Sequence, residues 1–475
     1  MKVDYIISSN HMLTMKGKGV GYVQNGAVAV QGNKIIKVGI KDEILAAYQA
    51  ETLIDAGNKL IMPGLIDAHI HTGLAMFRGV AQDMSHWMQK GLWPFKKHID
   101  VKETKKGSLV NIIEGIKAGT TTFGDYDLHM NELVENYSKI GARAKVAETV
   151  NELPNNLGDN PVTDLYTFDP ALGQEKYERA LKLYHEWHLK DDGRINVMLG
   201  PQGPDMLSIE LLKEVQNQAE KLDTLIHMHV AQGDRETLQM EKRYQKRSIP
   251  FLEELGMLNE RLIAVHLTEA TEEETIKIAK SGAKMTYCAG SIGIIDGIVT
   301  PVQTFIDAGG TACLGSDQAA GNNCNNMFNE MKFAAILNKV KYQDPRIFNA
   351  TQALRMATIE SAKVLGMENE IGSLEDGKKA DIILVNLDTP AFFPVLNYPI
   401  RNIVPNLVYS ANGSEVDLVM IDGKIIMNDR EVLTVCEKTA LTEAQAAAEK
   451  VVKLSTDDIL KADSDILKMV KEGLL

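Results

Sequence analysis

Two pairs of histidines have the spacing of metal ligands. His69 and His71 lie in PGLIDAHIHTG at the end of an apolar run, and His227 and His229 repeat the arrangement in TLIHMHVAQGD. Residues i and i+2 of a β-strand face the same side, so each pair directs two imidazoles to one place. A solvated strand face is the alternative, but the apolar run disfavours it. We expect the first pair to bind one metal ion, with at least one member of the second pair completing the site.

Two further candidate ligands end strand-like runs elsewhere in the chain. His266 follows LIAV, and Asp317 ends TACLGSD just before a loop rich in Gly and Asn. Imidazole and carboxylate donors without a thiolate favour zinc or iron over metals that prefer softer ligands. A single metal centre can be built from distant parts of the chain if several strands each end in a histidine or an aspartate, as they do here.

The segments that must position these residues alternate between strands and helices. Eight apolar strand-like runs, mostly followed by amphipathic helical stretches, lie within residues 62–366. This α/β order is typical of a parallel (β/α)8 barrel of the TIM type, whose active sites lie at the carboxyl ends of the strands. We therefore expect the candidate ligands to meet at one rim of a barrel.

The two ends of the chain differ from its middle. Short β-rich runs broken by turn residues occupy residues 1–61 and return in residues 367–434, which predicts one small β-sandwich domain formed from both termini. Residues 435–475 are rich in Ala, Glu and Lys and predict a helical tail.

Composition and charge narrow the classes of partner. The 475 residues carry 51 Lys and Arg against 64 Asp and Glu, a formal net charge of −13. Such a surface repels nucleic-acid phosphates and anionic lipids, so we expect neither nucleic acid nor a membrane as a partner. Any anionic ligand would need a local basic pocket. The four cysteines form no CxxC pair and the amino terminus lacks a signal-peptide pattern, which predicts a cytoplasmic protein.

The motifs together resemble the amidohydrolase superfamily, and within it the branch of the methylthioadenosine/S-adenosylhomocysteine deaminases and the triazine hydrolases. The resemblance covers nearly the whole chain and rests on motifs in the family order: PGLIDAHIHTGLAMFRG followed by LWP, AGTTTFGD, HMHVA, AVHLT, LGSDQAAGNN, IGSLEDGKKADIILVN and VMIDGKIIM. It implies the barrel with its sandwich domain and a hydrolase of carbon–nitrogen bonds other than peptide bonds.

The resemblance also implies one divalent metal, Zn²⁺ in the first place, with Fe²⁺ as the alternative. The family motif uses the second histidine of HMHVA, so the implied ligands are His69, His71, His229 and Asp317. Binuclear relatives bridge two metals with a carboxylated lysine, for which Lys145 is the only nearby candidate, so one metal is expected. His227 would be a neighbour on the same face. A homo-oligomer, a dimer or larger, is implied as well.

The expected chemistry follows from the metal. A bound cation lowers the pKa of water, so hydroxide can add to an electron-poor ring carbon that bears an amino group. Asp317 would take the proton and pass one to the leaving group, while His266 would donate a hydrogen bond. We therefore expect a hydrolytic deaminase of a small N-heterocycle, with Asp317, His266 and Gln232 as its catalytic residues.

Three positions depart from the nucleoside deaminases of the family. Gln232 stands where they carry a glutamate that shuttles a proton to the ring nitrogen, and Gln202 replaces a histidine that contacts the substrate. Lys96 follows LWP, where they have an acidic residue that can bind ribose hydroxyls. A lysine cannot accept hydrogen bonds from a sugar diol, whereas two glutamines suit a small ring with amino and oxo groups. We therefore expect a triazine- or pyrimidine-like substrate.

The loss of the shuttle glutamate leaves the route of the proton open. An amide cannot relay a proton, although it can hold one by hydrogen bonding. Either Asp317 with His266 performs all of the proton transfer, or Glu236, Asp234 or a water molecule substitutes for the missing carboxylate.

Loop residues supply the remaining candidates. Trp87 and Trp93 follow the first barrel strand together with Phe77 and Met84, and could form an apolar lid over a flat ring; ordinary loop packing is the alternative. Asn322 follows Asp317 and either lines the pocket or is solvated. The residues expected to bind substrate are Gln202, Trp87, Trp93, Lys96 and Asn322.

Other functions stay open at this level. They are a methylthioadenosine/S-adenosylhomocysteine-type nucleoside deaminase, a chlorohydrolase of a halogenated triazine, a dihydropyrimidinase-like hydrolase with two metals, and a catalytically silent barrel that only binds a ligand. The complete set of candidate ligands argues against a silent barrel.

Overall fold

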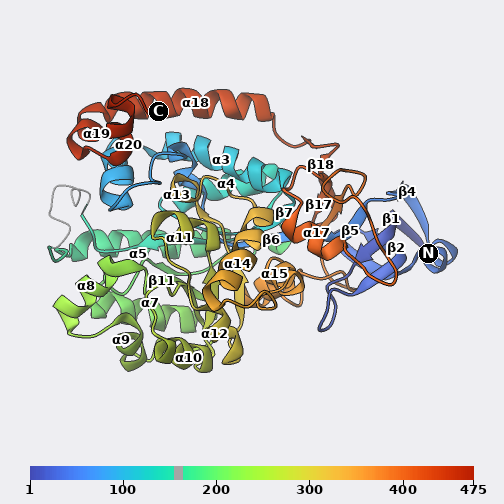
Figure 1. The fold of residues 1–475 in the computed structure, drawn as a ribbon, viewed down its shortest axis with the longest axis horizontal. Coiled ribbons are helices and arrows are strands. Elements are labelled where there is room, and N and C mark those ends of the chain that lie inside the picture. Colours follow the sequence, from blue (N-terminus) through green and yellow to red (C-terminus); the bar gives the residue numbers. More distant parts are fainter. Residues whose placement is uncertain (155–163) are drawn as a thin grey trace.

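A barrel of parallel strands forms the centre of the molecule, and a sheet domain built from both ends of the chain lies beside it (Figure 1). The computed structural model describes residues 1–154 and 164–475. In Figure 1 the blue amino-terminal strands and the orange carboxyl-terminal strands meet at the right, where β5 (Leu60–Pro63) pairs with β16 (Ile382–Val385). The predicted fold class, an α/β barrel with a small β-sandwich domain from both termini, is confirmed.

The barrel strands follow the order of the chain. They are β6 (Leu65–His71), β7 (Thr120–Asp127), β8 (Arg143–Val150), β9 (Ile195–Val197), β10 (Gly200–Pro201), β11 (Ile226–Val230), β12 (Leu262–His266), β13 (Lys284–Tyr287), β14 (Ala312–Leu314) and β15 (Asp317–Gln318). Two of the eight expected runs are interrupted, one as β9 and β10 and one as β14 and β15. The ring closes because β15 pairs in parallel with β6, while a bridge from Leu199 to Ile226 joins its two sheets.

Helices cover the outside of the barrel, so every residue of β7 and of β8 is buried, as in parallel sheets covered on both faces. The longer covering helices are α3 (Val101–Lys117), α4 (Met130–Ile140), α5 (Pro170–Trp187), α7 (Ile209–Lys221), α8 (Gly233–Tyr244), α10 (Glu272–Lys280) and α14 (Met327–Tyr342). Shorter ones are α6 (Lys190–Gly193), α9 (Ser248–Glu254), α11 (Ala289–Ile295), α12 (Val302–Asp307), α13 (Ala319–Asn322), α15 (Ala350–Met356), α16 (Ile359–Val364) and α17 (Ile403–Tyr409). Among the described residues, no helix is both long and apolar enough to cross a bilayer.

The sheet domain has nine strands and a core of its own. Its strands are β1 (Lys2–Leu13), β2 (Tyr22–Gln31), β3 (Lys34–Ile40), β4 (Gln49–Asp55), β5, β16, β17 (Val416–Ile421), β18 (Lys424–Asn428) and β19 (Glu431–Val432), with α1 (Lys41–Ala47) between β3 and β4. Ile7, Val28, Ile61 and Ile382 belong to this core. The predicted limit at residue 61 falls inside β5, which lies wholly in this sheet; the domain limits stay a prediction.

The segment after β6 and the end of the chain pack together. η1 (Thr72–Phe77), η2 (Met88–Leu92) and α2 (Trp93–Lys96) follow β6, and α18 (Glu437–Leu454), α19 (Thr456–Ala462) and α20 (Asp465–Lys471) end the chain. In Figure 1 the red α18 runs over α3, and Val451 and Ile459 share an apolar cluster with Phe77, Leu92 and Phe95. The tail therefore supports the segment that carries Trp87, Trp93 and Lys96.

A buried ion network joins the barrel to the sheet domain. Arg143, at the start of β8, donates from Nε and Nη2 to both oxygens of Asp381 at 2.7 and 2.9 Å, and from Nη2 to Asp422 at 3.0 Å. Its side chain is fully buried. Lys379 contributes a second cation, 3.2 Å from Asp422.

Replacing Arg143 should destabilise the protein strongly. Arg143→Met removes the guanidinium and leaves the buried carboxylate of Asp381 without its cation. Breaking a buried ion pair in this way typically lowers the free energy of unfolding by about 3–5 kcal/mol. Urea denaturation followed by tryptophan fluorescence measures the change. Lys37→Met, which removes an exposed ion pair with Asp376, is the control and should have little effect. Equal stability of both variants would contradict this role for the network.

Candidate metal centre and substrate cavity

β6 carries two histidines into the barrel. His69 is fully buried, His71 borders the cavity described below, and their ring centroids lie 4.7 Å apart. Nδ1 of His69 lies 2.8 Å from Nε2 of His227, and Nδ1 of His71 donates to the backbone oxygen of Tyr126. Because both Nδ1 atoms are engaged from behind, the Nε2 atoms are left as ligands, the usual arrangement around protein-bound metals.

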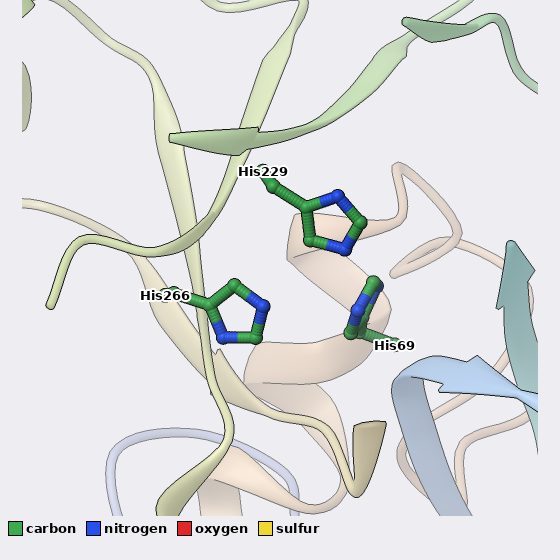
Figure 2. Close-up of side chains that lie close together, drawn as sticks. All are labelled: His69, His229 and His266. Atoms are coloured by element: carbon green, nitrogen blue, oxygen red, sulfur yellow. The ribbon is translucent and has the colours of Figure 1, made fainter. Parts of the chain in front are cut away.

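β11 and β12 are neighbouring parallel strands that add two more imidazoles. Figure 2 shows the side chains of His69, His229 and His266 converging. The ring centroids of His229 and His266 are 5.2 Å apart, and they lie 5.0 and 5.6 Å from that of His69. Nδ1 of His229 donates to the backbone oxygen of Gln202 at 2.8 Å, which again leaves Nε2 for the cluster.

Asp317 completes the cluster from the last barrel strand. Oγ of Ser291 donates to its Oδ2 at 2.6 Å. Its Oδ1 lies 3.6 Å from Nε2 of His69 and 3.3 Å from Nε2 of His71. Asp317 and His266 have backbone φ angles of 61° and 79°, in the left-handed region that side chains rarely adopt. Such strain persists where the surroundings impose a required side-chain position.

Three of the four histidines and Asp317 have the protonation state that binds a cation, whereas the pKa of His71 is raised, because its contact with Asp317 outweighs burial. Burial lowers the pKa of His69 to about 4 and that of His266 to about 3, and it lowers the pKa of His229 well below the usual value. Burial alone would raise the pKa of Asp317, but the adjacent imidazoles of His69 and His71 outweigh it and hold that pKa well below its usual range. Neutral imidazoles around an ionised carboxylate are ready-made metal ligands.

The protein itself does not satisfy the nitrogen atoms of this cluster. Within the described residues, Nε2 of His69 and both ring nitrogens of His266 are buried without a hydrogen-bond partner, although buried polar atoms normally have one. Two sets of donor atoms are close enough to bind one ion, because the atoms within each set lie within 4.8 Å of one another. One set comes from His69, His229 and His266, and the other from His69, His71 and Asp317. The residues present therefore fit a divalent cation. His266 belongs to the first set, although the family pattern places it outside the ligands.

Lys145 does not reach this centre. Its Nζ donates to the backbone oxygen of Leu365 at 2.6 Å, and burial lowers its pKa to about 8. Lys145 is therefore held by a backbone oxygen, and one metal rather than two stays a prediction.

A cavity of about 500 Å³ borders the cluster, a volume in the usual range for small-molecule sites. His71, His229 and Asp317 line it, whereas His69 and His266 are buried behind them. Five residues expected to contact substrate or to act in catalysis also line it: Trp87, Trp93, Lys96, Gln202 and Gln232. The fold thus brings most of the predicted site residues around one volume.

Asn322 lies elsewhere. It is 3% exposed and does not line the cavity. Its Nδ2 donates to the backbone oxygen of Ser316 and, at 2.8 Å, to Oε1 of Glu330, whose pKa burial raises to about 8. The amide that was expected to contact substrate therefore supports the loop after β15.

Neither acid considered as a substitute at Gln232 lines the cavity. The carboxylate of Glu236 accepts hydrogen bonds from the backbone N–H groups of Ala231 and Gln232 at 2.7 and 2.8 Å. Asp234 lines a neighbouring hollow instead. Of the alternatives considered, this arrangement leaves proton transfer by Asp317 with His266, or by water.

The cavity wall also includes residues that the sequence did not single out, among them Tyr126, Asp127, His129 and Arg235. Tyr126 lies with its ring centroid 5.1 Å from that of His229. Arg235 pairs with the buried Asp205. Tyr126, Asp127 and His129 end or follow β7, so the rule that barrel sites lie at the carboxyl ends of strands could have identified them.

The comparisons with known proteins agree with this geometry. Residues 60–426 match the model of the amidohydrolase family. A 5-methylthioadenosine/S-adenosylhomocysteine deaminase of Thermoanaerobacter pseudethanolicus is 33% identical over 95% of this chain and 100% of its own length. A 5'-deoxyadenosine deaminase of Methanosarcina mazei is 32% identical over 94% of this chain and 98% of its own.

Solved structures also resemble this chain over nearly its full length. A crystal structure of an adenosine deaminase from Xanthomonas campestris with bound zinc covers 95% of this chain and 99% of its own, with a TM-score of 0.87 and 26% identity. Atrazine chlorohydrolase from Arthrobacter aurescens, complexed with zinc, covers 94% of this chain and 100% of its own, with a TM-score of 0.82; at 20% identity it supports the fold alone.

Fold and site together define a metal-dependent hydrolase barrel. The chain belongs to the amidohydrolase family, as the match over residues 60–426 shows, and is a hydrolase of carbon–nitrogen bonds. The resemblance found in the sequence is thereby confirmed.

The donor set predicts how metal content responds to substitution. Purified protein loaded with Zn²⁺ and dialysed against a weak chelator should retain close to one ion per chain, measured by inductively coupled plasma mass spectrometry. His229→Ala should lose the ion because it removes a donor. His227→Ala should weaken retention about 10- to 100-fold, since it removes the support of Nδ1 of His69.

His188 provides the control. Its ring stacks on Tyr184 with centroids 4.3 Å apart, outside both sets of donor atoms. His188→Ala should retain the ion like the unchanged protein. Retention of the ion in His229→Ala, or close to two ions per unchanged chain, would contradict the assigned centre.

Proposed function

We propose that this protein is a hydrolytic deaminase that removes an amino group from an N-heterocyclic ring. The observation that carries the proposal is a buried histidine–aspartate donor set beside a cavity of about 500 Å³ with amide and aromatic walls. In the reaction the oxygen of water bonds to the ring carbon, the exocyclic C–N bond breaks, and the nitrogen leaves as ammonia or an amine.

The bound divalent cation supplies Lewis-acid chemistry and lowers the pKa of water, and we propose Zn²⁺ for this role. The support is a donor set without thiolate and the zinc in the Xanthomonas campestris structure. The predicted homo-oligomer and the cytoplasmic location stay predictions.

Asp317 and His266 are the groups proposed to move and hold protons. The ionised carboxylate of Asp317 can accept a proton from the attacking water and return it to the leaving nitrogen. His266 is neutral because burial lowers its pKa to about 3, so its ring can donate one hydrogen bond to the developing charge. Ser291 holds Oδ2 of Asp317 and thereby orients the carboxylate.

The proposed substrate is a small triazine- or pyrimidine-like ring. Gln202 and Gln232 provide amide donors and acceptors along the cavity, while Trp87 and Trp93 provide flat apolar surfaces for a ring. A second candidate, an adenosine-type nucleoside, is supported by the deaminases that are 32–33% identical over nearly the full chain. Lys96, which cannot accept hydrogen bonds from ribose hydroxyls, favours the first.

An ammonia-release screen of the zinc-loaded enzyme tests the function. We expect ammonia from amino-substituted triazines, pyrimidines or pterins, and we include purines, adenosine and 5'-deoxyadenosine as the nucleoside arm. Chloride release from a chlorotriazine measures the chlorohydrolase alternative. Asp317→Asn should lower kcat at least about 100-fold, since it removes the proton-transferring carboxylate.

The outcomes of the screen separate the candidates. Turnover of adenosine derivatives alone would make the preference for a small ring wrong. Release of chloride without ammonia would favour the chlorohydrolase. Ammonia from no compound, with ligand binding intact, would favour the silent barrel over a deaminase.

Gln232 should bind the ring without carrying a proton. Gln232→Leu is expected to raise KM about 10-fold through lost hydrogen bonds and to leave the pH profile of kcat unchanged, because an amide does not titrate. Gln232→Glu should add an ionisation to that profile. Steady-state kinetics between pH 5 and 9 measure both variants, and a pH profile altered by Gln232→Leu would argue that the amide takes part in proton transfer.

A further inference from the structure

One wall of the cavity carries positive charge that no carboxylate pairs with. Lys96, the last residue of α2, faces the cavity and forms no hydrogen bond or ion pair with any side chain in residues 1–154 and 164–475. The protein around the cavity lowers its pKa by desolvation, which outweighs the attraction of Asp127. The Lys96 side chain is exposed, so its ammonium group is open to a ligand that enters the cavity.

A second lysine lies close to the first. Burial is the largest cause that lowers the pKa of Lys176, on α5, to about 8, and repulsion by Lys96 is the next. The Nζ of Lys176 donates to Oδ1 of Asn151 at 2.7 Å and to the backbone oxygen of Leu153 at 3.3 Å. The two ammonium groups therefore both raise the electrostatic potential on this side of the cavity.

Lys176 also determines which atom Gln202 presents to the cavity. An ammonium group only donates hydrogen bonds, so Oδ1 of Asn151 must be the atom beside it. Nδ2 of Asn151 then donates to Oε1 of Gln202. The amide of Gln202 is thereby left with Nε2, a donor, turned away from Asn151 on the cavity wall. Lys96 and Nε2 of Gln202 therefore both offer hydrogen-bond donors to the cavity.

The other charged groups on the cavity wall have partners. Arg235 is neutralised by its ion pair with Asp205. Asp127 accepts hydrogen bonds from the backbone N–H groups of Gly73 and Leu128 at 2.7 and 2.8 Å. Lys97, which also lines the cavity, pairs with Asp458 at 2.8 Å. Among the described residues of the wall, Lys96 is therefore the cation left for a bound molecule to pair with, in a protein whose net charge is −13.

We propose that the substrate carries an anionic group, a carboxylate or a phosphate, that binds to Lys96 and to Nε2 of Gln202 while its amino-substituted ring lies against the metal centre. This inference rests on the proposed function, because it specifies the substrate class of the same cavity. Charge-assisted hydrogen bonds of this kind change affinity about 10- to 100-fold.

Matched pairs of compounds test the inference. Cytosine is compared with cytosine-5-carboxylate, and 5'-deoxyadenosine with adenosine 5'-carboxylate and with adenosine 5'-monophosphate, so that carboxylate and phosphate are separate arms. For the zinc-loaded enzyme, we expect the anionic member of at least one pair to have a kcat/KM at least about 10-fold higher. Lys96→Met should remove this preference, chiefly by raising KM, and Lys96→Arg should keep most of it.

Binding measurements separate this inference from the proposed function. The control is Lys102→Met, because Lys102 is an exposed lysine on α3. This variant should change neither the kcat/KM nor the binding of any of the compounds. If no compound releases ammonia, the proposed function fails, and isothermal titration calorimetry still decides the inference: tighter binding of an anionic member, lost in Lys96→Met, supports it. Equal binding or turnover of both members of every pair, or a preference that survives Lys96→Met, overturns it.

Discussion

Four imidazoles and one carboxylate share a space inside the barrel in which the protein by itself leaves ring nitrogens unsatisfied. Burial holds His69, His229 and His266 neutral, while Asp317 stays ionised beside them. Such an arrangement is costly without a cation, because buried polar atoms without partners destabilise a fold. The parallel strands, the strained backbone at Asp317 and the carbonyl groups behind the histidines all serve to maintain it.

The electrostatics of the cavity depend on two opposing charges, the negative protein surface and the positive cavity wall. An acidic protein surface surrounds a cavity wall that carries Lys96, and the nearby Lys176 sets the direction of a chain of amides that ends at Gln202. Long-range repulsion of anions by the surface and local attraction by this wall act on different length scales, because salt screens charges beyond about 10 Å. A small anion that reaches the cavity meets mainly the local field.

The segment that forms this wall depends on the end of the chain. Asp458 on α19 pairs with Lys97 at 2.8 Å and with His98 at 2.6 Å, directly after α2. Val451 packs against the same segment. The helical tail, far away in sequence and outside the barrel, therefore helps to hold Trp93 and Lys96 in place.

Local sequence patterns determined the fold class and the residue types of the centre. Alternating strands and helices predicted the barrel, and the HxH spacing placed two imidazoles on one strand face, because these features depend on neighbours two to four residues apart. Tertiary contacts decided the rest. Asn322 turned to Glu330 rather than to the cavity, Lys145 turned to Leu365, and Lys176, through Asn151, oriented the amide of Gln202. Each of these outcomes depends on a partner from another element, which no local periodicity encodes.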